Sequence, residues 1–308
     1  MILVTGGTGF VGQALIRHLL ASGKQVRTLL RPSKESPRLP RGIGVEAAVC
    51  SLRDERGLKA AMRDVDVVYH LAGAERHSSR AELHNVDVLG SEGVAAAAAS
   101  SGVRQIIYLS HLGTDRHSAY KLLQAKALAE AAVVNSGVPY TIIRSAAAYG
   151  PADQFTTSIL RLLRFSPGVF FLPGDGSSLL QPIWIEDLVY CLSMTMEDQN
   201  FANQLISIGG LETISFRQVV EMVMQVTGVR RSLVRMSPPN LRSLAVFLEQ
   251  FGRFPVSYYW LEYLAADRTT QLDSVPRMFG IMPARFHTQL GYLNATKRQG
   301  SRQRGYVL

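Results

Sequence analysis

Cysteine is scarce in this chain of 308 residues, which contains only Cys50 and Cys191. The two lie far apart in the sequence and form neither a C-x-x-C motif nor a pattern with metal-ligand spacing. A disulfide framework and a structural zinc site are therefore not expected. Two buried thiols in a reducing compartment are the expectation.

Long apolar runs are also missing, since no stretch approaches the roughly 18 residues that a membrane-spanning helix needs. Strand-like sequence begins at residue 1, which leaves no room for a signal or transit peptide unless one has been removed. We expect a cytoplasmic protein, and a peripheral location at a membrane surface stays open.

Acidic residues are outnumbered, with 24 Asp and Glu against 33 Lys and Arg, a net charge of +9. The cations are scattered and no nucleic-acid-binding motif accompanies them, so nucleic-acid binding is not expected. Part of the excess lies in residues 296–308, where Lys297, Arg298, Arg302 and Arg304 show no hydrophobic periodicity. This basic tail is predicted to be disordered, or to contact an acidic partner or an anionic membrane surface.

Glycine, in contrast, is concentrated where the chain begins. An apolar segment runs into Gly7, Gly9 and Gly12, which satisfy G-x-G-x-x-G, and Gly6 gives the wider G-x-x-G-x-x-G. A Cβ at these positions would block a tight turn, the approach of a pyrophosphate, and close helix–strand contact. A helix over residues 10–21 would direct its positive end at the phosphates. The pattern predicts dinucleotide binding, and the alternative is an empty Rossmann unit.

Strand and helix patterns alternate along the first half of the chain. This predicts an α/β fold with a Rossmann-type doubly wound parallel sheet and a smaller, mostly C-terminal α/β lobe. Helices are expected over 90–101 and 119–135, ended by Gly102 and Gly137. The expected domains are 1–150, with strand 204–208 returning to it, then a lobe over 151–295 and the tail. Strands are expected at 2–5, 25–30, 45–49, 66–71, 105–109, 140–144 and 204–208, and loops at 173–176 and 237–240.

Several motifs together resemble one family. They are Thr5-Gly-Gly-Thr-Gly-Phe-Val-Gly12, His70-Leu-Ala-Gly73, Ser110, Ile143-Arg144, Tyr149-Gly-Pro151 and Trp184-Ile-Glu-Asp-Leu188. The chain is similar to the extended and atypical short-chain dehydrogenase/reductases of the NAD(P)-dependent epimerase/dehydratase superfamily. Residues 140–144, 151–153 and 277–285 are most similar to the branch with the NAD(P)H-binding accessory subunit of respiratory complex I and NmrA-like proteins. The resemblance implies a cofactor site made by Gly6, Gly7, Thr8, Gly9, Phe10, Val11, Gly12, Leu52, Leu71 and Ala72.

The end of the second strand bears on the choice of cofactor. A NAD-preferring site would place Asp or Glu there, whereas this chain has Leu29-Leu30-Arg31-Pro32. Arg31 offers a planar charged fork for a 2′-phosphate, so NADP(H) is favoured over NAD(H). The alternative is that Arg31 is a solvated residue leaving a strand.

The catalytic motif of the family, Y-x-x-x-K, is split in this chain. Tyr120 is followed four residues later by Gln124, and Lys126 is preceded four residues earlier by Leu122. Tyr120 and Lys126 are about 240° apart on an ideal helix and cannot share a face unless the helix starts after Tyr120. The resemblance implies that Lys126 holds the nicotinamide ribose and that Ser110 orients substrate. An exposed helix lysine and a local strand-end serine are the alternatives.

Two hypotheses follow. The first is an NADPH-dependent reductase or epimerase-type enzyme acting on an apolar carbonyl or quinone-like substrate through Lys126 and Tyr120. The second is a cofactor-binding accessory or regulatory subunit whose C-terminal lobe docks on a membrane-associated protein complex. An amphipathic segment over 241–251 and the aromatic residues Tyr258, Tyr259 and Trp260 would line a core, a docking surface or a lipid pocket. The split motif favours the second hypothesis, with weak or no catalysis.

Overall fold

The computed structural model describes residues 1–33, 44–74, 82–166, 168–250, 264 and 266–294. The chain divides into two compact units. The first unit comprises Met1–Ser145 and Ile185–Ile208, and the second comprises Ala146–Trp184 and Gly209–Leu308. The expected basic tail and the aromatic residues Tyr258, Tyr259 and Trp260 lie outside the described residues.

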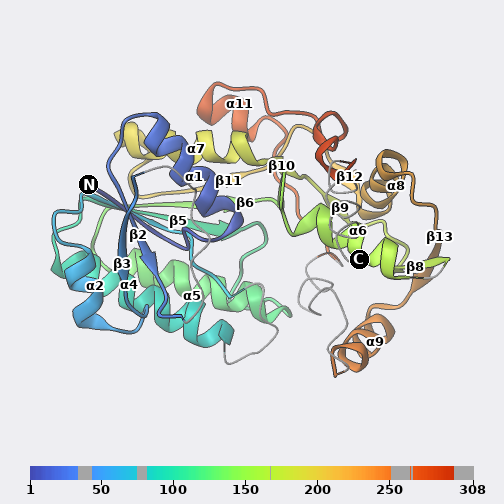
Figure 1. Cartoon of the computed structure of the whole chain (residues 1–308), viewed down its shortest axis with the longest axis horizontal. Coiled ribbons are helices and arrows are strands. Elements are labelled where there is room, and N and C mark those ends of the chain that lie inside the picture. The colour runs from blue at the N-terminus through green and yellow to red at the C-terminus, as the bar shows by residue number, and fades with distance from the viewer. Residues whose placement is uncertain (34–43, 75–81, 167, 251–263, 265, 295–308) are drawn as a thin grey trace, which may run out of the picture. The chain divides into compact units, whose positions relative to one another are not determined.

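The first unit contains a seven-stranded parallel sheet in the order β11-β6-β5-β4-β1-β2-β3 (Figure 1). The order reverses between β1 and β4, as in a doubly wound Rossmann-type fold, so the predicted fold class is confirmed. The inner strands are buried on both faces, which is why they are continuous apolar runs. The strands are β1 (Ile2–Thr5), β2 (Val26–Leu30), β3 (Glu46–Val49), β4 (Val67–His70), β5 (Gln105–His111), β6 (Tyr140–Ser145) and β11 (Gln204–Ile208).

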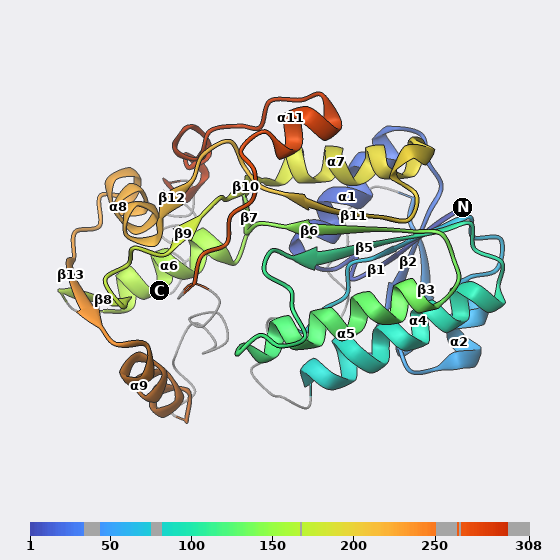
Figure 2. The ribbon, with the colours of Figure 1, turned by 180° about the vertical axis from the view of Figure 1, so that it is seen from behind.

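Helices cover both faces of this sheet. Figure 1 shows α1 (Phe10–Ala21) and α7 (Ile185–Glu197) on one face, and Figure 2 shows α4 (Leu89–Ser100) beside α5 (Lys121–Asn135) on the other, with α2 (Glu55–Ala61). One hydrophobic cluster joins the sheet to α2, α4 and α5, and both cysteines are buried free thiols. Burial raises the pKa of the Cys191 thiol. The cluster includes Leu3, Leu58, Val68, Val94, Ile106, Tyr108, Val133 and Ile142.

The ends of two helices agree with the glycine signals in the sequence. Gly102 has φ +67° directly after α4, and Gly137 has φ +75° directly after α5. Both φ values lie in the left-handed region that favours glycine, which ends the helix. The strand at residues 204–208 pairs in parallel with β6, with Gln204 opposite Thr141. Helix α7 also belongs to the first unit, although the sequence placed it in the C-terminal lobe.

A π-helical turn, η1 (Leu83–Val88), leads directly into α4 and was not expected from the sequence. A π-helix is wider than an α-helix, so the residues that follow it are rotated relative to a regular helix. Here the turn contains the buried side chain of Asp87. A charged side chain therefore lies inside the first unit, close to the carboxyl ends of the central strands.

The second unit is built from short strand pairs and helices. Its pairs are β7 with β10, β8 with β13, and β9 with β12. Their bounds are β7 (Ala148–Tyr149), β8 (Val169–Pro173), β9 (Leu179–Leu180), β10 (Ile183–Trp184), β12 (Ile214–Ser215) and β13 (Ser232–Met236). The helices are α6 (Phe155–Phe165), α8 (Phe216–Thr227), α9 (Pro238–Gln250) and α11 (Ser274–Phe279), and short 3₁₀ turns are η3 (Phe286–Gln289) here and η2 (Gln199–Phe201) in the first unit.

The loop expected at Ser237-Pro238-Pro239-Asn240 is wrong, because α9 begins at Pro238. Proline is accepted in the first turn of a helix, where the missing N–H would have no intrahelical partner. Two adjacent prolines therefore mark the start of this helix instead of interrupting one. Residues 241–250 of the expected amphipathic segment form the rest of α9, whose described side chains end at Phe247, and residue 251 lies outside the described residues.

Asp153 organises the start of α6. Its carboxylate accepts hydrogen bonds from the Gly150 N–H at 2.8 Å, the Thr156 hydroxyl at 2.7 Å and the Tyr292 hydroxyl at 2.8 Å. Burial nevertheless raises the pKa of Asp153. The Thr157 N–H donates to the other carboxylate oxygen at 3.0 Å, and these four donors satisfy the buried carboxylate where water cannot.

None of the helices in the described part of the chain is both long and apolar enough to cross a bilayer.

Candidate functional site

The glycine loop between β1 and α1 is held by backbone contacts. Gly6 has φ +73°, and a Cβ there would lie 2.7 Å from the backbone of Leu71 and Ala72. At Gly12 a Cβ would lie 2.2 Å from the Gly6 carbonyl oxygen, far inside van der Waals distance. Helix α1 therefore starts in direct backbone contact with the loop. The sequence predicted this close helix–strand contact.

Gly9 differs from the other loop glycines. Its N–H donates to the Gly6 carbonyl at 2.9 Å, and a Cβ would meet only that oxygen, at 3.1 Å. The fold therefore requires glycine less strictly at this position. Gly9 is the N-cap of α1, whose first-turn N–H groups have no partner within the helix. This cradle and the positive helix end fit a pyrophosphate, as the motif predicted.

Of the other residues predicted for the cofactor site, only Leu71 and Ala72 are seen against the loop glycines. Leu71 and Ala72 follow β4, where they adjoin Gly6, and Leu52 packs on Gly90 and Gly93 of α4. Thr8 is exposed, and its carbonyl accepts a hydrogen bond from the Gln13 side chain at 2.9 Å. Phe10 and Val11, the first residues of α1, are half-buried.

Arg31 follows β2 directly. Its side chain is exposed, and no described residue forms a hydrogen bond or an ion pair with its guanidinium group. In the sheet β2 is the neighbour of β1, on the side away from β4. The placement permits the predicted contact with a 2′-phosphate, and that contact stays a prediction.

A buried polar chain lies behind the loop. The Thr5 hydroxyl and His70 Nδ1 are 2.7 Å apart, and His70 Nε2 is 2.8 Å from the Ser91 hydroxyl. Burial, and then the positive charge of Lys126, lower the pKa of His70 to about 3. The ring is thus neutral at physiological pH and joins β1, β4 and α4. Sequence reasoning quoted His70 only as part of a motif.

Lys126 is buried inside the first unit, with 2% of its side chain exposed. Its ammonium lies 3.1 Å from Asp87 Oδ1, whose side chain is fully buried, and 5.5 Å from the centre of the Tyr108 ring. The other Asp87 oxygen accepts the Ala74 N–H at 3.0 Å. The structure therefore excludes the exposed helix lysine considered above. No pattern in the sequence marks Asp87, because its burial depends on the π-helical turn.

Tyr120 is the N-cap of α5, with φ −95° and ψ 121°. The helix starts at Lys121, which meets the condition under which Tyr120 and Lys126 could approach each other. Leu122 and Lys126 lie one turn apart within α5, and Leu122 is buried. The helical position one turn before Lys126 thus holds a hydrocarbon side chain. Participation of the Tyr120 phenol stays a prediction.

Ser110 is fully buried near the end of β5, and its hydroxyl is 3.1 Å from that of Thr114. Thr114 donates to the His111 carbonyl at 2.7 Å. Since a hydroxyl has one hydrogen, Ser110 must donate to Thr114, and its own oxygen keeps only acceptor capacity. In this arrangement Ser110 cannot also donate a hydrogen bond to a substrate carbonyl.

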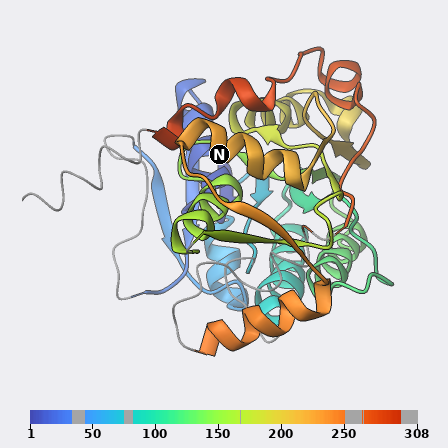
Figure 3. The same cartoon turned by 90° about the vertical axis from the view of Figure 1, so that its right-hand side faces the viewer.

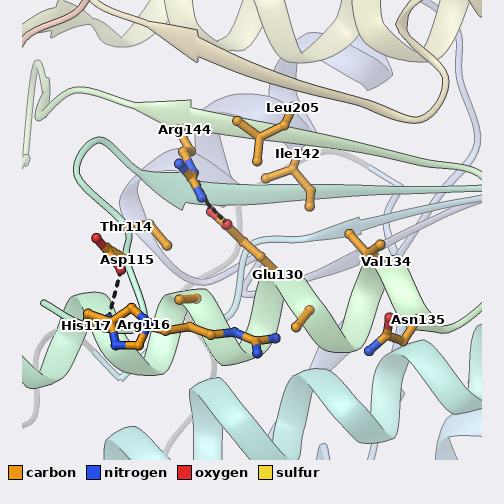
Figure 4. Close-up of a pocket in the computed structure, with 12 residues that line it drawn as sticks. Thr114, Asp115, Arg116, His117, Glu130, Val134, Asn135, Ile142, Arg144 and Leu205 are labelled. Atoms are coloured by element: carbon orange, nitrogen blue, oxygen red, sulfur yellow. Dashed lines mark hydrogen bonds and ion pairs between the residues drawn. The ribbon is translucent and has the colours of Figure 1, made fainter.

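A separate pocket of about 600 Å³ opens between α5, β6 and β11 (Figure 4). The Arg144 guanidinium is held there by Glu130, with N···O distances of 2.9 and 2.6 Å. Its lining includes Thr114, which connects it to Ser110, but no residue of the glycine loop. Polar side chains at one end are Asp115, Arg116 and His117, and apolar ones are Val134, Ile142 and Leu205.

The doubly wound sheet and the glycine cradle at its switch point define the class of an NAD(P)-binding Rossmann protein. Residues 6–157 match the family model described as NAD(P)H-binding. This match supports the resemblance to the extended short-chain dehydrogenase/reductases, and the relatives of the chain include named subunits of mitochondrial NADH dehydrogenase.

Two curated relatives illustrate the range of this family. The NADH dehydrogenase (ubiquinone) 1 alpha subcomplex subunit 9, mitochondrial, of Arabidopsis thaliana is 27% identical over 248 residues, which cover 79% of this chain and 61% of the relative. The chain thus matches less than two thirds of that subunit's length. Sterol demethylase protein B of Methylococcus capsulatus is 27% identical over 320 residues, covering 91% of this chain and 93% of the relative. Reductases are also among the relatives.

The fold also agrees with solved structures. The NADPH-dependent quinone oxidoreductase QOR2 of Escherichia coli, complexed with NADPH, superposes with a TM-score of 0.74. The alignment covers 95% of this chain and 99% of that one, at 17% sequence identity. At this identity the likeness establishes the fold.

The glycine geometry predicts opposite outcomes for two alanine substitutions. Gly12→Ala forces its methyl group onto the Gly6 oxygen and should destabilise the chain by at least about 3 kcal/mol. Gly9→Ala should stay folded but lose the rise in melting temperature that NADPH gives. That rise reflects about 2.7 kcal/mol at a hundredfold excess over Kd. Differential scanning fluorimetry measures both, and an unchanged NADPH shift in folded Gly9→Ala would argue against this site.

The buried ion pair predicts strong coupling between its two members. Lys126→Met leaves the Asp87 carboxylate buried and uncompensated, which should cost about 3–5 kcal/mol in free energy of unfolding. Adding Asp87→Asn removes that charge, so the double variant should be more stable than Lys126→Met alone. Urea unfolding gives these values. The control is Lys59→Met, which breaks the exposed Lys59–Glu55 pair and should cost less than about 1 kcal/mol.

Proposed function

We propose that this protein is an NADP(H)-binding accessory or regulatory subunit with weak or no hydride-transfer activity. The cofactor stabilises the first unit, and the second unit contacts a partner. The observation that carries this proposal is the neighbourhood of Lys126, where Leu122 takes the position of the tyrosine and Asp87 already neutralises the ammonium.

The chemistry of the site supports a binding role more than a catalytic one. A Y-x-x-x-K pair works because a lysine charge and the nicotinamide ribose lower the pKa of the phenol, which then exchanges a proton. Here the Lys126 ammonium forms an ion pair with the buried Asp87 carboxylate, and the Ser110 hydroxyl donates to Thr114. Lys126 and Ser110 can still hold a cofactor in place. Their existing partners, however, limit their ability to lower the pKa of a phenol or to donate a proton.

When bound, the nicotinamide dinucleotide would supply hydride chemistry, and this chain's residues would hold it. The Gly6–Gly12 loop and the first turn of α1 are suited to its pyrophosphate. Leu52, Leu71 and Ala72 offer apolar contacts, and Arg31 offers a charged fork at the end of β2. Lys126 would approach the ribose hydroxyls only by sharing its ammonium with Asp87.

The partner class is carried over from the curated relatives. One of them is named as a subunit of NADH dehydrogenase (ubiquinone), and we propose that this chain likewise attaches to a membrane-associated protein complex. Its place would then be peripheral, at a membrane surface on the cytoplasmic side. Because a bound ligand stabilises the folded state, the stability of this subunit would rise with the concentration of NADPH. The stability of the complex would then depend on that concentration.

A second function has support from one specific observation. Helix α5 starts after Tyr120, which meets the condition under which the Tyr120 phenol could approach Lys126, and reductases are among the relatives. In this case the protein is an NADPH-dependent oxidoreductase acting on an apolar carbonyl or quinone-like substrate, with Tyr120 as the acid.

Cofactor preference is tested at Arg31. The wild type should bind NADPH about 10- to 100-fold more tightly than NADH, as expected for one or two charge-assisted hydrogen bonds to the 2′-phosphate of about 1.5–3 kcal/mol in total. Arg31→Asp should remove or reverse that preference through repulsion. Calorimetric titration with both nucleotides measures it, with Arg17→Asp on the exposed side of α1 as the control. Equal wild-type affinities would remove Arg31 from the site.

Catalysis is tested at Tyr120. We expect little NADPH oxidation with a panel of aldehydes, ketones, quinones and enones, and unchanged NADPH affinity in Tyr120→Phe. The control is Tyr140→Phe, which loses a half-buried phenol at the opposite, amino end of a central strand. Vigorous wild-type turnover that falls by about 10²–10⁴ only in Tyr120→Phe would establish a general acid and sink the non-catalytic proposal.

A further inference from the structure

The positive charge of this protein is concentrated in the second unit. By sequence, that unit has 15 Lys and Arg against 8 Asp and Glu, a net charge of +7, whereas the whole chain has +9. Fourteen of these 15 cations are arginines. Four of these cations, Lys297, Arg298, Arg302 and Arg304, lie in the basic tail outside the described residues, and the rest of the second unit has a net charge of +3. A positive surface attracts an anionic one, so the position of the remaining arginines decides where such a surface would bind.

Two segments of the second unit contain no carboxylate at all. Residues 154–174 and 222–248 have no Asp or Glu, but they hold six arginines. The structure brings these segments together, because β8 and β13 pair in parallel with Ser232 opposite Val169 and Met236 opposite Pro173. Figure 3 shows this two-stranded ribbon with α9 along one side. The arginines are Arg161, Arg164, Arg230, Arg231, Arg235 and Arg242.

The arginines at the start of the ribbon are available to a ligand. Arg231 donates from Nε to the Ser166 carbonyl at 2.7 Å, which places the end of α8 beside the end of α6. Arg161, Arg164 and Arg230 are exposed, and no described residue forms a hydrogen bond or an ion pair with their guanidinium groups. In the described part of the chain, three arginines without an ion-pair partner therefore belong to the two acid-free segments that meet here.

Large apolar side chains are exposed among these cations. Phe171 and Val234 lie opposite each other in the ribbon and are 37% and 40% exposed, and Phe165, at the end of α6, is 53% exposed. On α9 the exposed side carries Arg242, Val246 and Phe247. Phenylalanine and valine have no polar atom to offer water, so exposing several beside arginines indicates a surface that meets an apolar phase.

We infer that the β8–β13 ribbon with α9 binds the surface of an anionic lipid bilayer. Arginines would contact lipid phosphates while the phenylalanine and valine side chains enter the boundary with the acyl chains. A nucleic acid could stack on phenylalanine, but it would leave the two valines in water. This goes beyond the proposed function, since it does not require the cofactor or a protein partner.

The test is sedimentation of the full-length chain with vesicles. Binding should be strong to mixed phosphatidylcholine and phosphatidylglycerol, weak to pure phosphatidylcholine, and reduced by salt. The triple variant Arg161→Gln, Arg164→Gln, Arg230→Gln should weaken binding about a hundredfold, or roughly fivefold per arginine. Phe165→Ser should also weaken it at unchanged charge.

The matched control removes three exposed arginines of the first unit, by Arg17→Gln, Arg56→Gln and Arg63→Gln. It loses the same charge and should retain most of the vesicle binding. Equal losses in the two triple variants would show that only net charge matters, and would overturn the assignment of this surface. Arginine-dependent binding to single-stranded RNA without vesicle binding would overturn it as well. The NADPH-induced rise in melting temperature should persist in both triple variants, so the cofactor proposal is tested separately.

Discussion

A buried ammonium group must be compensated, and in the first unit this requirement falls on Lys126. Its side chain is 2% exposed, so water cannot stabilise the charge. Asp87 provides the counter-charge from the π-helical turn that precedes α4, and the Tyr108 ring provides its negative face. The same positive charge helps to keep His70 neutral, which lets its two nitrogens join Thr5 of β1 to Ser91 of α4. The irregular turn and the polar chain thus depend on one lysine.

This arrangement explains how one fold can serve both enzymes and binding proteins. The glycine cradle depends only on backbone atoms that lie close together. Gly12 adjoins the Gly6 carbonyl, and Gly9 has no side chain to cover the N-terminus of α1. Proton transfer depends instead on side chains of β5 and α5, such as Ser110 and Lys126. Because the two requirements involve different residues, the cofactor site can persist while Leu122 replaces a phenol and Asp87 holds the lysine. A binding function then needs no further change in the sheet.

The second unit follows different physical rules. Among its described residues the strands are short and arranged in pairs, and they form no large sheet with two covered faces. Asp153 and its four donors fix the start of α6, and the Ser215–Gln218 capping box fixes the start of α8. In the second unit, hydrogen bonds at helix ends thus fix where α6 and α8 begin, whereas in the first unit the helices pack on a large sheet. The exposed arginine and phenylalanine side chains of this unit take no part in these helix-end hydrogen bonds.

The sequence alone determined the first unit's strands, the ends of α4 and α5, and the glycine cradle, because these depend on local patterns. Apolar runs specify buried parallel strands, and Gly102 and Gly137 adopt the left-handed conformation that ends a helix. Tertiary structure decided the rest. The pairing of Lys126 with Asp87 requires a π-helical turn, the donor direction of Ser110 depends on Thr114, and the acid-free segments meet only through the pairing of β8 with β13. Each of these contacts joins residues whose proximity has no periodic signal in the chain, so only the folded packing brings their charges and hydrogen bonds together.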